Sequence, residues 1–105
     1  MELIDTKAYA VFCRELSGYG KLLNELISAE NLNIERLKEI RIAAHRIKGG
    51  AGFFGLERIG ELGGTLEVIS MEDPKQIAAR IPELSRILME LSVLIKLLLD
   101  PEVTR

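Results

Sequence analysis

The sequence predicts an all-α protein, folded as an antiparallel up-down bundle of four helices. Apolar residues recur at spacings of three and four along almost the whole chain, as in helices with one buried face. No segment shows the strict alternation of apolar and polar residues that is typical of a half-buried strand. The connections between the four apolar stripes are short, and antiparallel packing is the simplest way to bury the stripes together. With 105 residues, we expect a single domain that spans residues 1–105.

The first helix is predicted from about Asp5 to Ala29. Two glycines, Gly18 and Gly20, weaken its middle because glycine is a poor helix former. Its buried stripe is predicted to comprise Ala8, Phe12, Leu16, Tyr19, Leu23 and Leu26.

The second helix is predicted to begin after Asn33. An Asn side chain accepts a hydrogen bond from a free N–H group at a helix start, and Glu35 suits the positive end of the helix dipole. The helix runs into a glycine-rich stretch, in which Gly55 is the predicted turn residue. The inward stripe of this helix is Leu37, Ile40, Ala44, Ile47 and Ala51.

The rest of the chain is predicted to form a third helix and a final helical segment. The third helix extends from about Leu56 to Ser70, and Glu72–Pro74 marks the next turn. Pro82 interrupts the last apolar pattern, so there is either a kink or a short helix followed by a long one that begins near Ile81. The predicted inward residues are Ile59, Leu62, Leu66 and Ile69, and then Ile77, Ile81, Leu84, Leu88, Leu91, Ile95 and Leu98.

Composition excludes several classes of function. A formal net charge of −2 argues against a general nucleic-acid binder, because such proteins rely on clustered Lys and Arg. Cys13 is the only cysteine and His45 the only histidine, so an internal disulfide, a zinc site or catalysis by several histidines is not available. The chain shows neither a secretory signal nor an apolar run long enough to span a bilayer. We therefore expect a soluble, cytoplasmic protein with no membrane partner.

His45 is predicted to face solvent. At about 100° per residue, it lies about 120° from the centre of the apolar stripe of the second helix. A lone histidine in a helix is ordinarily a core or surface residue without chemistry, but the neighbours of this one are basic or small. They are Lys38, Arg41, Lys48, Gly49 and Gly52, with Ile34 and Ile42 at the margins. Arg41 and Lys48 are close enough on the helix surface to act on a phosphoryl group carried by the imidazole.

The glycines need an explanation, because each glycine inside a helix costs about 1 kcal/mol relative to alanine. Close helix packing explains Gly60, Gly63 and Gly64, which share one flank of the third helix. Gly49 and Gly52 lie beside the exposed histidine, where missing side chains leave room for a partner. Glu67 also lies on the glycine-bearing flank. If that flank adjoins the His45 face, Glu67 hydrogen-bonds one imidazole nitrogen and leaves the other nucleophilic.

These residues resemble a known family. The string Ala43-Ala44-His45-Arg46-Ile47-Lys48-Gly49-Gly50-Ala51, with Gly55 and Leu66-Glu67 downstream, resembles the His-x-x-Lys-Gly signature of histidine-containing phosphotransfer (HPt) domains. That family includes the phosphotransfer domains of chemotaxis and hybrid histidine kinases. The resemblance is detailed over residues 34–69 and looser over the rest of the chain.

The resemblance implies an HPt-like four-helix bundle without an ATP site. His45 accepts a phosphoryl group from a kinase or from the Asp of a receiver domain and passes it to the Asp of a response-regulator receiver domain. Lys48 stabilises the phosphate, Gly49 permits docking and Glu67 orients the ring. The predicted docking residues are Lys38, Arg41, Ile42, Gly49 and Gly52. No cofactor is implied, and the Mg²⁺ belongs to the partner. We expect a bacterial monomer; whether it is free-standing or part of a larger kinase stays open, as do its partners and the direction of transfer.

Three other interpretations carry less weight. Residues 50–55 satisfy Gly-x-Gly-x-x-Gly, but that dinucleotide motif requires a preceding strand, and here it follows a helix. Phe53 and Phe54 are expected to close the bundle end. A helical docking bundle without phosphoryl transfer is the main alternative function, whereas metal or haem ligation by His45 would need ligands that the chain lacks.

Overall fold

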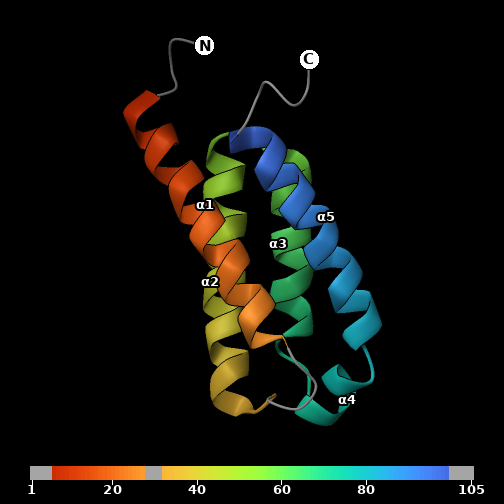
Figure 1. The fold of residues 1–105 in the computed structure, drawn as a ribbon. Helices are drawn as coiled ribbons and strands as arrows, with labels where there is room; N and C mark the ends of the chain where they lie inside the picture. The colour runs from red at the N-terminus through yellow and green to blue at the C-terminus, as the bar shows by residue number, and fades with distance from the viewer. Residues whose placement is uncertain (1–5, 28–31, 100–105) are drawn as a thin grey trace.

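The computed structural model describes residues 6–27 and 32–99, which form helices joined by short connections (Figure 1). No strand occurs in these two ranges. The helices are α1 (Thr6–Leu26), α2 (Ile34–Phe53), α3 (Glu57–Ile69), α4 (Pro74–Ala78) and α5 (Ile81–Leu99).

The four long helices form the predicted antiparallel bundle. Each packs on two neighbours: α2 lies between α1 and α3, while α5 lies between α3 and α1. Figure 1 shows the short helix α4 at one end of the bundle, where it joins α3 to α5. The largest of these contacts joins α2 and α3, the helices that carry the candidate site.

The ends of α2 follow from local hydrogen bonds. Asn33 caps its start as predicted, because Oδ1 accepts from the N–H of Arg36 at 2.8 Å. At the other end, α2 continues through the glycine-rich stretch, and Gly55 ends it with a φ of 73°. The N–H of Leu56 donates to the carbonyl of Ala51 at 2.8 Å, which completes a Schellman cap. Gly55 is therefore the turn residue that the sequence predicted.

Proline decides the arrangement after α3. Asp73 Oδ1 accepts from the N–H of Lys75 at 3.0 Å, and Pro74 is at the start of α4, where no N–H is needed. Pro82 likewise is the second residue of α5. Of the two arrangements that the sequence allowed, the chain adopts a short helix followed by a long one that begins at Ile81.

The predicted stripes form one core, with one error. The fully buried members include Leu16, Leu23, Ile47, Leu66 and Leu91. Ala8 was predicted to be buried and is exposed. Figure 1 shows the first turns of α1 diverging from α2 and α5; in these turns Tyr9 still packs against Phe54, whereas Ala8 is exposed. The predicted limits of that helix, Asp5 and Ala29, lie outside the described residues.

Arg80, which follows α4, forms hydrogen bonds with α5 and with the segment after α3. Its guanidinium donates to Glu83 in α5 from Nε at 2.9 Å and from Nη2 at 3.0 Å, and it also pairs with Glu72 after α3. The hydrogen bond from Arg80 is the main reason why the pKa of Glu83 lies below the usual glutamate range. The cluster therefore joins the connection around α4 to the bundle.

This cluster predicts a pH-dependent stability difference. A carboxylate whose pKa is lowered by folding contributes stability above its unfolded pKa, near pH 4.3, and loses it as the pH falls through the folded value. Replacing Arg80 by Gln is therefore expected to lower the urea midpoint at pH 7 and to have a smaller effect near pH 3.

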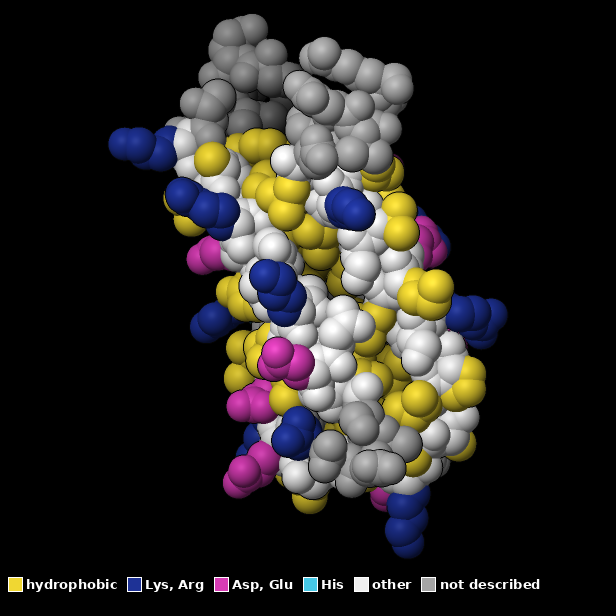
Figure 2. Space-filling view, in the orientation of Figure 1, with side chains coloured by type: hydrophobic (Ala, Val, Ile, Leu, Met, Phe, Trp, Pro, Cys, Tyr) yellow, Lys and Arg dark blue, Asp and Glu magenta, His cyan; other side chains and the backbone are white. Residues whose placement is uncertain are grey.

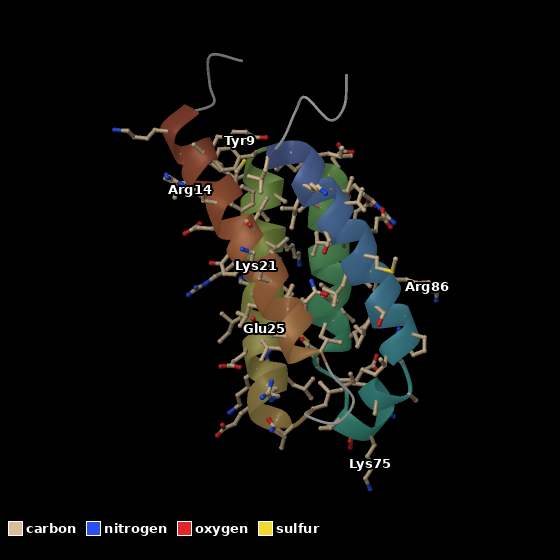
Figure 3. All side chains as sticks on the ribbon, viewed as in Figure 1. Tyr9, Arg14, Lys21, Glu25, Lys75 and Arg86 are labelled. Atoms are coloured by element: carbon tan, nitrogen blue, oxygen red, sulfur yellow. The ribbon has the colours of Figure 1, made fainter. Side chains whose placement is uncertain are left out.

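The matched control for Arg80→Gln is Lys75→Gln, which removes a charge from α4. Figure 3 shows Lys75 directed away from the bundle. The control is expected to leave the midpoint nearly unchanged at both pH values. Equal losses for Arg80→Gln at pH 7 and pH 3 would contradict the electrostatic explanation.

Candidate functional site

The site is on the exposed side of α2, around the single histidine of the chain. The buried side of α2 comprises Leu37, Ile40, Ala43, Ala44, Ile47 and Ala51. His45 faces the other way and has 69% of its side chain exposed, as predicted. Figure 2 shows the side of the bundle formed by α1 and α5, where apolar side chains fill the seam and no histidine is visible.

Glu67 of α3 lies beside the imidazole ring. Its Oε2 is 2.7 Å from Nδ1 of His45, and its Oε1 is 3.5 Å from Nζ of Lys48. The Glu67 side chain is only 13% exposed, whereas the other two are largely in solvent. The glycine-bearing flank of α3 therefore adjoins the His45 face, and the hydrogen bond that depended on this arrangement is present.

The Glu67 carboxylate determines which ring nitrogen is free. Its pKa lies below the usual glutamate range, chiefly because it accepts a hydrogen bond from His45; nearby positive charge acts in the same direction and partial burial opposes it. An ionised carboxylate has no proton to donate, so the hydrogen in this contact belongs to Nδ1. In the neutral ring, Nε2 then has the lone pair. The arrangement leaves a nucleophilic nitrogen on the exposed side of the site.

Gly49 and Gly52 follow His45 by about one and two helical turns, on the same exposed face. A Cβ atom at either position would meet no other heavy atom within 4 Å. Packing among the described residues therefore does not require glycine at these positions. Because the two glycines have no side chains, the surface of α2 next to His45 is open, and another molecule has room to approach the imidazole.

The other predicted docking residues lie before His45 on α2. Lys38 and Ile42 are exposed, with Ile42 at 53%, and Arg41 is half-buried. Together with Lys48, they place cationic and apolar side chains on the part of α2 that carries His45. The structure thus brings the predicted set to one side of the bundle.

Phe53 departs from the expectation that it closes the bundle end. Its side chain is 81% exposed, whereas Phe54 packs against Tyr9 and Phe12 with ring centroids 5.2 and 5.3 Å apart. Consecutive helical residues point about 100° apart, and because α2 continues through the glycines, only Phe54 faces α1.

Two exposed apolar residues near the site were missed by sequence reasoning. Phe53 follows His45 by eight residues on one continuous helix, and Val68, next to Glu67, is 64% exposed. The helical spacing of Phe53 from His45 was the available signal. Both residues add exposed apolar surface to the two helices that carry His45 and Glu67.

Among the described residues, no group of three or more His, Cys, Asp or Glu side chains is placed to hold a metal ion. None of the helices in residues 6–27 and 32–99 combines the length and apolar character needed to cross a bilayer.

Comparison with known proteins identifies one family. The family model described as Hpt domain matches residues 7–98, which is most of the chain. No curated protein and no solved structure gives a significant match.

Proposed function

The chain belongs to the Hpt domain family, whose members act in histidine phosphotransfer within phosphorelays, and from this membership we propose that His45 is the residue that carries the phosphoryl group. The observation that supports this role is the 2.7 Å contact between Nδ1 of His45 and the Glu67 carboxylate. It leaves Nε2 unprotonated in the neutral ring and open to a partner.

The proposed step is an in-line displacement at phosphorus. Nε2 of His45 forms the new N–P bond as the bond from phosphorus to the donor oxygen breaks, and the donor leaves as a carboxylate or as ADP. Nδ1 keeps its proton, so the phosphorylated ring is cationic. The Glu67 carboxylate stabilises that positive charge through the existing hydrogen bond. The reverse displacement transfers the group to the Asp of the next receiver domain.

Lys48 is proposed to stabilise the phosphoryl group. It follows His45 by three residues, so both side chains leave the same side of α2. Its side chain is 57% exposed, its ammonium nitrogen is 3.5 Å from Oε1 of Glu67, and a flexible stem lets the ammonium move to a phosphoryl oxygen. The remaining groups that catalyse transfer, including Mg²⁺, are supplied by the partner.

The proposed partners are a histidine kinase or hybrid-kinase receiver as donor and a response-regulator receiver as acceptor. They are proposed to dock over Lys38, Arg41, Ile42, Gly49 and Gly52. The exposure of most of these residues, and the open space at the two glycines, support this surface. We further propose that the chain is a single domain, because one core unites the four long helices, and that it acts as a cytoplasmic monomer.

The test is direct phosphorylation. The purified protein is incubated with a phosphorylated receiver domain or with an active kinase and ATP, and the labelled product is mapped by mass spectrometry. We expect acid-labile, alkali-stable phosphate on His45. An acyl phosphate would be labile in alkali, and phosphate on any other residue would contradict the proposal.

Replacement of Lys48 by Ala is expected to slow transfer without changing helicity. A hydrogen bond to a charged group contributes about 1.5–3 kcal/mol, so the rate should fall roughly tenfold to a hundredfold if the bond forms in the transition state. Rates are measured by rapid quench, and helicity by far-ultraviolet circular dichroism. Lys75→Ala, which removes an exposed lysine from α4, should transfer at the wild-type rate. Lost helicity in Lys48→Ala would instead make Lys48 a structural residue.

A further inference from the structure

Helices α2 and α3 come close together at Gly63, next to the turn of α2 that carries His45. A Cβ atom at position 63 would be 3.0 Å from the backbone N of Lys48, 3.1 Å from the carbonyl O of Ala44 and 3.0 Å from Cγ2 of Ile47. Two of these three atoms are main-chain atoms of one turn of α2, the turn that carries His45. A main-chain contact of this kind is relieved only when one helix moves relative to the other.

The same close packing of α2 against α3 affects the position of Glu67 relative to the imidazole ring. Gly63 and Glu67 are four residues apart, so they are neighbours on one face of α3. His45 leaves α2 within the turn that Gly63 contacts. The separation of the two helices at Gly63 therefore sets the gap that the His45 and Glu67 side chains have to bridge, and across it Oε2 of Glu67 lies 2.7 Å from Nδ1.

We propose that Gly63 is a positioning residue, whose missing side chain sets the His45–Glu67 hydrogen bond and thereby keeps the imidazole proton on Nδ1. The effect of Gly63 on phosphoryl transfer rests on the function proposed above, whereas its effect on the position of the imidazole proton does not. An alanine at position 63 requires its neighbours to move by a few tenths of an ångström. The hydrogen bond lengthens, the preference for the Nδ1 proton weakens, and fewer neutral rings have a free Nε2.

Neighbouring Gly60 provides a matched control. A Cβ atom there would be 3.6 Å from the Cβ of Ala51 and at least 3.9 Å from the backbone of α2, which are ordinary contacts. Gly60→Ala and Gly63→Ala make the same change in helix propensity within one helix. They differ in whether the added methyl group presses on the main chain of the His45 turn.

The experiment measures directly which nitrogen of the imidazole ring carries the proton. The ¹⁵N resonances of the imidazole are recorded for the wild type, Gly63→Ala and Gly60→Ala at a pH at which the ring is neutral. We expect the separation between Nδ1 and Nε2 to decrease in Gly63→Ala and to stay at the wild-type value in Gly60→Ala. Transfer by Gly63→Ala should be roughly threefold to tenfold slower, because small displacements of reacting groups reduce rates steeply. Unchanged ring resonances in Gly63→Ala would overturn the proposal.

A double variant shows whether Gly63 acts through Glu67. In a Glu67→Ala background, Gly63→Ala is expected to cause no further change in the ring resonances. A second change of the original size there would overturn the proposal, because it would show an effect that bypasses the carboxylate.

Glu67→Asp repeats the test without crowding the helices. It withdraws the carboxylate by one methylene and should also narrow the separation of the ring resonances. Wild-type ring resonances in Glu67→Asp would contradict the proposal. Loss of the helical fold in Gly63→Ala would also contradict it. If the wild type accepts no phosphate, the proposed function fails, while the ring resonances still decide the role of Gly63.

Discussion

Replacing His45 by Gln is expected to abolish phosphorylation of the protein. An amide side chain is not a nucleophile, and the chain has no second histidine that could take over. With only 31% of the His45 side chain covered, the fold does not depend on it, and the variant should keep its helicity. The measurement is incorporation of labelled phosphate from a phosphorylated receiver domain, and we expect it to fall to the background of the donor alone.

Two checks make the His45→Gln result decisive. The purified variant must show wild-type far-ultraviolet circular dichroism, so that loss of label is not loss of structure. Arg46→Gln supplies a neighbouring control, because this exposed side chain points toward α1, where it donates to the Tyr19 hydroxyl. It should remain phosphorylated. Acid-labile phosphate that persists on His45→Gln would rule out the assignment of His45.

Replacing Leu66 by Ala is expected to lower the free energy of unfolding by about 2–5 kcal/mol. Leu66 is fully buried in the core on α3, and removal of its side chain leaves a cavity that the packed helices only partly fill. The stability is measured by urea unfolding with circular dichroism, and a shift in midpoint at constant slope is the expected result.

Val68→Ala is the matched control for the core, two residues further along the same helix. Its side chain is 64% exposed, so we expect a change within about 0.5 kcal/mol. The pair compares a buried with an exposed position of one helix, since both variants introduce alanine into α3. Similar midpoints for Leu66→Ala and Val68→Ala would contradict the assignment of the core.

Local patterns predicted most of the fold. The caps at Asn33 and Gly55 depend on side chains and dihedral angles within one turn, and they occur where the sequence placed them. Predictions failed where neighbouring elements determine whether a residue is buried. Ala8 continues the apolar stripe of α1, yet it is exposed, because the first turns of α1 diverge from the rest of the bundle. Phe53 is exposed although it is aromatic, because α2 turns it away from α1.

The sequence by itself determined the helices, their buried faces and the exposure of His45, because a helical period relates residues within a few turns of one another. It also indicated Glu67, but only on the condition that two helix faces meet. The tertiary structure alone decided that condition. Nδ1 of His45 and Oε2 of Glu67 come within 2.7 Å because α2 packs closely on α3, with little room for a side chain at Gly63, and that packing joins residues remote in the chain.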